Sequence, residues 1–500
     1  MDELKSLNAS TLSALPDGVR VPGYDRSKLT AGILHVGLGN FHRAHQAWYL
    51  HRLFEQGEGH DWAIVGAGVR APDAIQREKL QKQDWLTTLI ELDPSGRSAE
   101  VVGSMIDFVP VDEDNAALIA RMAQPDIRIV SLTVTEGGYY LNPSAGGFDA
   151  EHPDIQYDLS NPAAPKTVFG AMIAALQRRR DSGIGPFTCM SCDNLQGNGA
   201  ILKNTLLSMA TMIDPELATW IESECSFPNS MVDCIVPATG LAELALVRSF
   251  GIDDDAPVTH ENFRQWVIED DFCAGRPAWE NVGVTFSNDV HVYEAMKLRI
   301  LNGGHQIVAM PGELLRLNTI DQAMAHPLVK GLLKNVVTEE IAPHVQSVPD
   351  MEPLDYLDLI DTRFSNPEIK DTTRRVAFDG SSRQPGFLLP AVWDGLRSGT
   401  PIDGLALSSA LWCRYCEGTF EDGSQIEPND PNWSELQTLA LLAQKDPMQW
   451  LEQKHIYGDL SDQPEFSNAF CYWHRVIRQG GVEAALKDFL ARDEVRLSFG

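Results

Sequence analysis

Cysteine, basic residues and long apolar runs are all scarce in this sequence. Its 8 cysteines in 500 residues are too few for a disulfide scaffold and suit a reducing, cytosolic setting. No apolar run approaches the ~20 residues that cross a bilayer, and the N-terminal stretch does not resemble a signal peptide. With 40 Lys+Arg against 70 Asp+Glu, the net charge of −30 repels phosphate backbones and anionic membranes. We therefore expect a cytoplasmic protein that binds neither nucleic acid nor membrane.

The cysteines include two pairs at CxxC spacing, Cys189/Cys192 and Cys413/Cys416. Two such pairs could together hold a tetrahedral zinc ion. The first pair, however, lies in the segment FTCMSC, which is typical of a buried strand, and strand residues three apart face opposite sides of a sheet. Buried cysteine commonly serves as a small apolar residue. We therefore predict no metal site.

The length and the hydrophobic pattern indicate more than one domain. Up to about residue 240, short apolar runs rich in β-formers alternate with helical stretches such as 166–180; the runs are 33–36, 62–69, 127–134 and 186–192. Strands that are apolar throughout and alternate with helices predict a parallel sheet with both faces covered. We predict a doubly wound α/β domain over residues 1–287.

The sequence changes character after about residue 290. Apolar residues recur at helical spacing in segments 326–341, 354–364 and 434–444, broken by proline and glycine, and few β-rich runs remain. We predict a mainly α-helical domain over residues 288–500.

A dinucleotide signal follows the first predicted strand. Gly37 and Gly39 form a Gly-x-Gly turn ahead of a predicted helix, which would bring a pyrophosphate against backbone N–H groups. His42 replaces the third glycine of the usual GxGxxG pattern. Arg43, one turn into the helix, would add positive charge to the phosphate contact. A tight turn without a ligand is the alternative.

An acidic residue after the second strand commonly holds the adenosine ribose of NAD. Asp73 is the candidate, although it lies 34 residues beyond Gly39 instead of the usual ~20. Arg70 would instead accept a 2′-phosphate, so the sequence leaves the choice between NAD and NADP open.

Residues 293–305 carry the most informative set of polar side chains. In a helix, at ~100° per residue, Glu294 would lie about 60°, His305 about 80° and Asn302 about 140° around the axis from Lys297, and we interpret these four residues as one broad polar face. Oxidation of an alcohol needs a base for the hydroxyl proton, and a lysine serves when its pKa is lowered toward neutrality. A carboxamide can donate to the developing oxyanion. The alternative is an amphipathic helix with a solvated Lys297 and a core-capping Asn302.

Several motifs that lie far apart in the sequence are informative when they are taken together. GLGNFHRAH, TEGGY, MSCDN, SMVD, MKLRILNGGH and DGSSRQP occur in this order between about residue 30 and residue 385. The chain thereby resembles the polyol-specific long-chain dehydrogenases, and the resemblance extends past residue 480. It implies a Rossmann-type domain followed by a helical domain, and a metal-independent oxidation of a sugar alcohol such as mannitol to its ketose, fructose, with NAD. It also implies a monomer.

The resemblance assigns roles residue by residue. Lys297 becomes the general base and Glu294 the carboxylate that passes the proton to solvent. Asn194 and Asn302 become oxyanion donors, and His305 orients the substrate. Substrate contacts fall to Asp233, Arg375 and Arg383, and cofactor contacts to Gly37, Gly39, Phe41, Arg43, Asp73, Thr135, Glu136 and Asn194.

Two other activities stay open at this point. A uronate reductase of the fructuronate or tagaturonate type would use Arg375 and Arg383 to grip the substrate carboxylate. A third interpretation is a dinucleotide-binding protein without catalysis, or a zinc-dependent alcohol dehydrogenase.

Overall fold

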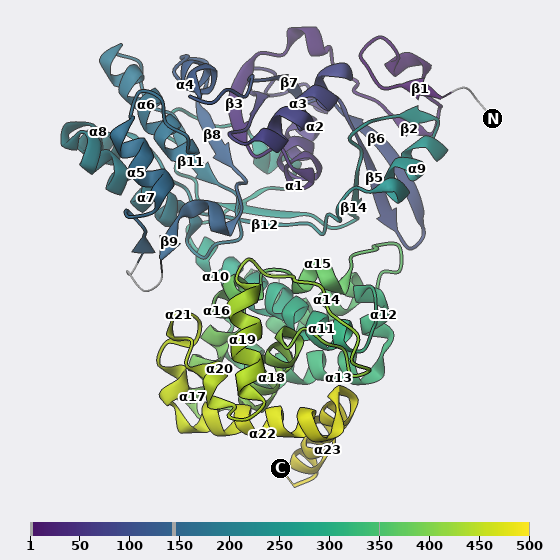
Figure 1. Ribbon diagram of the computed structural model, residues 1–500. Helices are drawn as coiled ribbons and strands as arrows, with labels where there is room; N and C mark the ends of the chain where they lie inside the picture. Colours follow the sequence, from purple (N-terminus) through teal and green to yellow (C-terminus); the bar gives the residue numbers. More distant parts are fainter. Residues whose placement is uncertain (1–3, 143–146, 350, 500) are drawn as a thin grey trace. The chain divides into compact units, whose positions relative to one another are not determined.

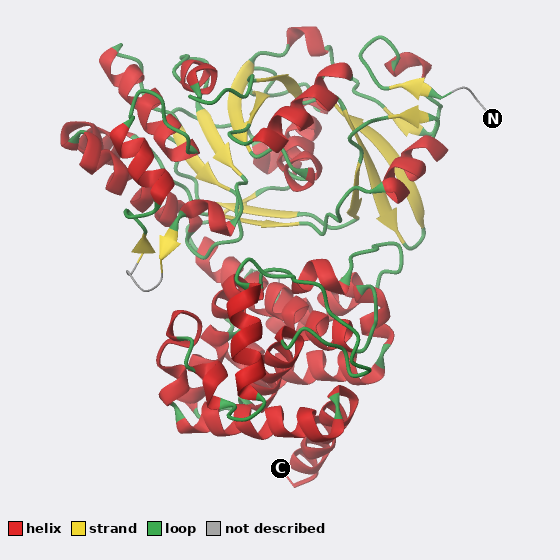
Figure 2. Cartoon of the chain, viewed as in Figure 1, coloured by secondary structure: helices red, strands yellow, loops and turns green. Residues whose placement is uncertain are grey.

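The computed structural model describes residues 4–142, 147–349 and 351–499, without the side chains of residues 136, 142 and 493–499. The chain divides into two compact units, Met1–His291 and Val292–Gly500. Strands gather in the first unit, whereas the second is built of helices (Figures 1 and 2). The sequence-based boundary after residue 287 falls between strand β16 (Thr285–Phe286) and helix α10 (Val290–Met296).

A five-stranded parallel sheet forms the centre of the first unit. Its strand order is β11-β8-β3-β4-β7, and every neighbouring pair is parallel. In chain order this is 5-4-1-2-3, the order of a Rossmann fold, so the predicted α/β fold class is confirmed. The strands are β3 (Ala31–Val36), β4 (Ala63–Ala67), β7 (Met105–Phe108), β8 (Ile129–Leu132) and β11 (Thr188–Ser191).

Helices cover both faces of this sheet, which is why its strands are mostly apolar. On one face, Leu34 and Val65 pack with helices α4 (Ala116–Met122) and α6 (Val168–Asp181). On the other face, Ile33 and Ile64 pack with α2 (Gln46–Glu55). Figure 1 shows α4 to α8 grouped beside β8 and β11. The remaining helices of that group are α5 (Pro153–Ser160), α7 (Asn198–Ile213) and α8 (Pro215–Glu224).

The first CxxC pair follows the same alternation of faces. Cys189 belongs to the hydrophobic cluster on the α6 side of the sheet, and Cys192 to the cluster on the α2 side. Cys413 and Cys416 are buried in helix α18 (Asp403–Cys416) of the second unit. Each of these thiols therefore fills apolar space.

Besides two two-stranded pairs, the described residues of the first unit form two smaller sheets that were not visible in the sequence. One is four-stranded, with order β14-β5-β6-β2, and the other is three-stranded, with order β12-β15-β16. Their strands carry polar residues, as in TTLIELD and GRSAEVV, so they lack the continuous apolar signal of the central sheet. They are β2 (Val19–Arg20), β5 (Thr87–Asp93), β6 (Gly96–Val102), β12 (Ser230–Asp233), β14 (Val258–Glu261) and β15 (Gln265–Ile268).

The second unit packs its helices around α11 (Gly303–Leu314) and α18. A Cβ on Gly304 of α11 would lie 3.1 Å from Leu333 Cδ1 and 3.6 Å from Phe364 Cε2, so glycine permits close helix packing there. Around them lie α12 (Ile320–Ala325), α13 (Pro327–Asn335), α14 (Pro353–Phe364), α15 (Thr373–Ala377), α16 (Gly380–Phe387), α17 (Leu389–Ser398), α19 (Trp433–Ala443), α22 (Pro464–Gly480) and α23 (Val482–Phe499). None of the helices within the described ranges is long and apolar enough to span a membrane.

Candidate active site

The glycine turn follows β3 and leads into helix α1 (Asn40–Ala44). Gly37 has φ +98°, and a Cβ there would overlap the carbonyl oxygen of Thr133, so only glycine fits the turn. Gly39 differs, because a Cβ there would meet no atom within 4 Å. Open space thus faces the Gly39 backbone, which suits the close approach of a dinucleotide phosphate.

The turn lies where the strand order of the central sheet reverses. β3 and β8 are neighbours but are followed by elements on opposite faces, and dinucleotides bind in the crevice at such a point. His35 of β3 bridges the two strands, with 2.7 Å from Nδ1 to Ser131 Oγ and 2.9 Å from Nε2 to Thr133 Oγ1. The hydroxyl of Thr133 in turn donates to the carbonyl of Gly37 at 2.6 Å.

Two buried imidazole rings, those of His35 and His42, lie next to the glycine turn. The rings of His35 and His42 stack with centroids 3.4 Å apart and planes 13° apart. Burial lowers the pKa of His35 to about 3. Burial, together with the nearby His35, lowers the pKa of His42 well below its usual value. Both rings are therefore neutral at pH 7, which allows them to stack.

We expect the free energy of unfolding to fall as the pH drops below about 6.5. The unfolded chain protonates these histidines there, whereas the folded chain resists protonation of His35 down to a pKa of about 3. Each such group removes up to about 1.4 kcal/mol of stability per pH unit within this window. Urea unfolding between pH 7 and pH 5 measures the slope. A His35→Gln variant should show a shallower slope, and an unchanged slope would contradict this role of His35.

Arg43 fastens the glycine turn to the rest of the first unit. Its guanidinium donates to the carbonyl of Ala256, to Asn40 Oδ1 at 2.8 Å and to the Gly39 carbonyl at 3.3 Å. The side chain is 3% exposed. Because its nitrogens donate to protein groups, we propose that Arg43 holds the turn in place, in addition to contributing its charge.

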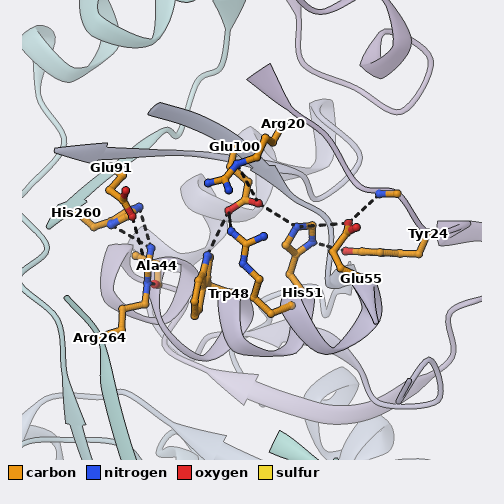
Figure 3. Close-up of polar contacts among 12 residues, drawn as sticks. Arg20, Tyr24, Ala44, Trp48, His51, Glu55, Glu91, Glu100, His260 and Arg264 are labelled. Carbon is orange, nitrogen blue, oxygen red and sulfur yellow. Dashed lines mark hydrogen bonds and ion pairs between the residues drawn. The ribbon is translucent and has the colours of Figure 1, made fainter. Parts of the chain in front are cut away.

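An ionic network attaches helix α2 to the four-stranded sheet (Figure 3). Glu100 of β6 accepts from Arg52 at 2.6 Å and from Trp48 Nε1 at 3.2 Å. Burial alone would raise the pKa of Glu100, but the hydrogen bond with His51 and the charge of Arg52 have the larger effect and lower the pKa to about 2. Tyr24 contacts the other side of His51, with 2.7 Å between its hydroxyl and His51 Nδ1.

Arg264 links the same helices to the neighbouring strands (Figure 3). Its Nε donates to the carbonyl of Ala44, the last residue of α1, at 2.8 Å, and its guanidinium carbon lies 4.1 Å from the Trp48 ring centroid. His45, between α1 and α2, contacts the Gln265 carbonyl at 2.9 Å and stacks on Phe41 at 4.9 Å. The helices that follow the glycine turn are therefore fixed by both smaller sheets.

Asp73 lies in the first turn of helix α3 (Ala71–Lys82), after β4. Its Oδ2 accepts from the backbone N–H of Val69 at 3.1 Å and of Arg70 at 2.9 Å. The carboxylate thus sits at the carboxyl end of the second strand of the sheet, where Rossmann folds place their ribose-binding acid. The exposed Arg70 lies 4.0 Å from it.

The segment after β8 has an unusual backbone. Thr135 has φ +69° and ψ 162°, a region that is essentially restricted to glycine and costs other residues about 1–3 kcal/mol. The carboxylate of Asp193 accepts from the N–H of Thr135 at 2.8 Å and from that of Val134 at 3.1 Å. Asn194, half-buried, is the next residue. The side chain of Glu136 lies outside the described residues.

Lys297 begins a π-helical segment, Lys297–Asn302, between α10 and α11 (Gly303–Leu314). The segment differs from the predicted α-helix, as the i→i+5 bond from the Gly303 N–H to the Leu298 carbonyl shows. The wider turn brings residues five apart, such as Lys297 and Asn302, to the same side, where α-helical geometry separates them by ~140°. π-Helical turns in helices are frequent at functional sites.

The side chains around this segment are buried and polar. Lys297 is 5% exposed and Glu294 is 3% exposed. Among the described residues, no group pairs with Asn302 Oδ1. The His305 ring stacks on Phe364, with centroids 4.1 Å apart and planes 8° apart, so its orientation is fixed. The solvated Lys297 of the alternative interpretation is not observed.

The three predicted substrate residues differ in their surroundings. Asp233, at the end of β12, is 3% exposed and lies opposite Gln265 in the sheet. Arg375 is paired bidentately with Asp371, through Nε–Oδ1 at 2.6 Å and a second contact from Nη2 to Oδ2. Arg383 is half-buried and donates to the Val376 carbonyl at 2.9 Å.

Comparison with known proteins decides the family. The sequence model of the mannitol dehydrogenase Rossmann domain matches residues 31–281, and that of the mannitol dehydrogenase C-terminal domain matches residues 289–476. The chain belongs to the mannitol dehydrogenase family. The resemblance found in the motifs is thereby confirmed.

Members of the mannitol dehydrogenase family are similar to this chain over nearly its full length. Mannitol 2-dehydrogenase of Cereibacter sphaeroides is 56% identical over 470 residues, covering 94% of this chain and 98% of that protein. A solved structure, Pseudomonas fluorescens mannitol 2-dehydrogenase in a ternary complex with NAD and D-mannitol, has a TM-score of 0.93 and 40% identity, covering 97% of this chain and 100% of its own. A substrate-free D-sorbitol dehydrogenase has a TM-score of 0.82 and 36% identity, covering 96% and 100%.

Within each unit, some residues that contact the predicted site residues were missed in the sequence. Gln306, next to His305, donates to the same Val376 carbonyl as Arg383, at 2.9 Å. Asp193 and His35 connect neighbouring strand ends. Asp193 stands inside the MSCDN motif, but nothing in that motif indicates which backbone groups the carboxylate would meet.

Proposed function

We propose that this chain is an NAD-dependent polyol dehydrogenase that interconverts mannitol and fructose without a metal ion. The observation that carries the proposal is the buried Lys297 at the start of a π-helical segment, in a chain of the mannitol dehydrogenase family. The relative that is 56% identical is a mannitol 2-dehydrogenase, and the similar solved structure contains NAD and D-mannitol.

The residues of the glycine turn fit a dinucleotide. Gly37 allows the turn, Gly39 leaves space in front of the backbone, and Asp73 would meet the adenosine ribose. Thr135, Glu136, Phe41 and Asn194 are the further residues that we propose to contact it. When bound, NAD accepts the hydride from the carbinol carbon.

Lys297 is the general base of the proposed reaction. Its Nζ accepts the hydroxyl proton of the polyol, and Glu294, three residues earlier, passes the proton on to solvent. Burial penalises the charged form of an amine, so the buried position of Lys297 helps to keep it competent as a base.

Amide groups stabilise the oxygen that loses its proton. Asn302 and Asn194 are the proposed donors, because a carboxamide donates without adding charge. Asn302 Oδ1, which has no partner among the described residues, is an acceptor, so it would take a hydrogen bond from a further substrate hydroxyl while Nδ2 donates to the oxyanion. His305, held by Phe364, orients the substrate hydroxyls, and Asp233 and Arg383 make further substrate contacts.

The pairing of Arg375 favours a neutral substrate over a uronate. Asp371 neutralises this guanidinium through a bidentate ion pair. A substrate carboxylate would have to compete with Asp371 for it. We therefore assign Arg375 to holding the α15 region and, at most, to a hydroxyl contact.

Initial rates with a polyol panel test the proposed function. We expect NADH absorbance to rise with mannitol and NAD, with a higher kcat/KM than for sorbitol, arabinitol or any uronate. Prolonged chelation should leave the rate unchanged, because lysine replaces the metal as the activating group. NADP in place of NAD measures the contribution of Arg70. A preference for uronates, or loss of activity on chelation, would contradict the proposal.

A further inference from the structure

The carboxylate of Asp193 holds three donors that all come from one segment, residues 134–139. Two are the successive backbone N–H groups of Val134 and Thr135, at 3.1 and 2.8 Å, and the third is the hydroxyl of Tyr139, at 2.8 Å. Asp193 is 8% exposed and Tyr139 is fully buried. Burial, followed by the charge of Asp193, raises the pKa of Tyr139 well above its usual value, so this phenol stays a donor.

The conformation held in this way is one that threonine adopts only under constraint. Thr135 combines φ +69° with ψ 162°, and its β-branched side chain makes that region more costly than it would be for glycine. A constraint is therefore needed on both sides of the Cα. The paired N–H contacts of Val134 and Thr135 with Asp193 supply it on the N-terminal side, and the buried Tyr139 anchors the segment on the C-terminal side.

The contacts of Asp193 with residues 134–139 lie next to the residues of the proposed reaction. The 134–139 segment leaves the carboxyl end of β8, beside the strand β3 that carries the glycine turn. Asp193 follows the end of β11, which pairs with β8 on its other side. Its chain neighbour Asn194 is the proposed oxyanion donor. One residue thus fixes the cofactor segment relative to a residue of the reaction.

We infer that Asp193 is a positioning residue, which holds Thr135 in its strained conformation and thereby shapes the dinucleotide site next to Asn194. This inference rests on the proposed function, since it concerns the cofactor of that reaction. It assigns no contact between Asp193 and the cofactor. Its effect is transmitted through the backbone of Val134 and Thr135.

The chain offers a matched control in Asp158. This carboxylate, which is fully buried where Asp193 is 8% exposed, accepts from the N–H groups of two successive residues, Lys166 at 2.7 Å and Thr167 at 3.1 Å, and from a hydroxyl, Thr167 Oγ1, at 2.5 Å. It holds the segment before α6, and Thr167 has φ −87°, an ordinary value. D158N therefore removes the same kind of interaction away from the glycine turn.

NADH binding to the full chain, measured by fluorescence titration, tests the inference together with the thermal midpoint of each variant. We expect D193N to weaken NADH binding by at least ~10-fold and to raise the KM for NAD more than it lowers kcat, because hydrogen bonds to a charged acceptor are strong. D158N should lower the thermal midpoint by a similar amount and leave NADH affinity within about twofold. Equal NADH affinities in D193N and D158N would overturn the inference.

A double-substitution cycle separates the strain from the loss of the Thr135 side chain. If Asp193 acts by holding a strained residue, the factor by which D193N weakens NADH binding should be several-fold smaller in a T135G background. An undiminished factor would overturn the inference. Should D193N fail to fold, Y139F removes the Tyr139 hydroxyl, which contacts Ser191 Oγ at 2.5 Å as well as Asp193, and should still weaken NADH binding by about threefold. Unchanged affinity would overturn the inference.

These results also distinguish this inference from the proposed function. A wild-type chain that neither binds NADH nor oxidises polyols would contradict the proposed function, and the inference with it. A wild-type chain that binds NADH as tightly as D193N does would contradict the inference alone.

Discussion

Replacing Lys297 with alanine should lower kcat for mannitol oxidation by about 10²–10⁴-fold, the range typical of general acid–base catalysis. The amine is buried at the start of the Lys297–Asn302 segment, and alanine leaves no base at this position. Steady-state kinetics with mannitol and NAD measure the loss. Turnover close to that of the wild type would remove the lysine base from the mechanism.

Two controls show whether such a loss concerns chemistry or folding. NADH binding should survive in Lys297→Ala, because the glycine turn and Asp73 belong to the other compact unit. Lys330 provides a matched lysine, since it lies in the same unit but forms an ion pair with Asp361 at 2.6 Å and is partly exposed. Lys330→Ala should retain nearly full activity, because exposed ion pairs contribute little.

Alanine at the two glycines of the turn should give two different defects. In Gly37→Ala, the new Cβ overlaps the Thr133 carbonyl and meets a positive φ, so both thermal stability and NADH binding should be lost. In Gly39→Ala, the new Cβ meets open space and an ordinary φ of −75°, so the chain should fold normally. Its NADH affinity should nevertheless fall by about 10²-fold, since the methyl group occupies the approach of the phosphate.

The contrast between the two variants is the informative measurement. Thermal unfolding without ligand gives the stability of each, and fluorescence titration gives its NADH affinity. A Gly39→Ala chain that is stable and binds NADH normally would show that the dinucleotide does not approach the turn. An unstable Gly39→Ala chain would show that the fold itself requires glycine at this position, independently of any bound dinucleotide.

The central sheet could be predicted from the sequence because its strands are buried on both faces. Runs such as 33–36 and 127–134 are therefore rich in Ile, Leu and Val. The strands β5 and β6 could not be found in this way, because one end of β6 is exposed and both strands contain charged residues. Their identity depends on pairing with each other, a non-local property.

The sequence allowed the candidate site residues to be named, but it did not allow their arrangement in space to be predicted. Lys297 and Asn302 stand out by residue type, yet a π-helical segment leaves no mark on composition, since it depends on how the flanking helices pack. Asp371 pairs with Arg375 four residues later, but it lies before the N-cap of α15, so helical i,i+4 spacing alone does not predict this pair. The Asp193 contacts could not be predicted either, because they need the ends of β8 and β11 to be adjacent.

The wide turn at Lys297–Asn302 allows the packing of α11 and the direction of the Lys297 side chain to be set separately, whereas a regular helix would fix both together. One extra residue in the turn shifts the angular phase of α10 against that of α11 by roughly a quarter of a revolution. The direction of the amine can therefore be set without rotating Gly304 away from Leu333. The packing of α11 and the direction of the Lys297 side chain therefore depend on different features of the sequence. We expect substitutions in the packed face of α11 to leave the direction of Lys297 unchanged, as long as the number of residues in the wide turn is preserved.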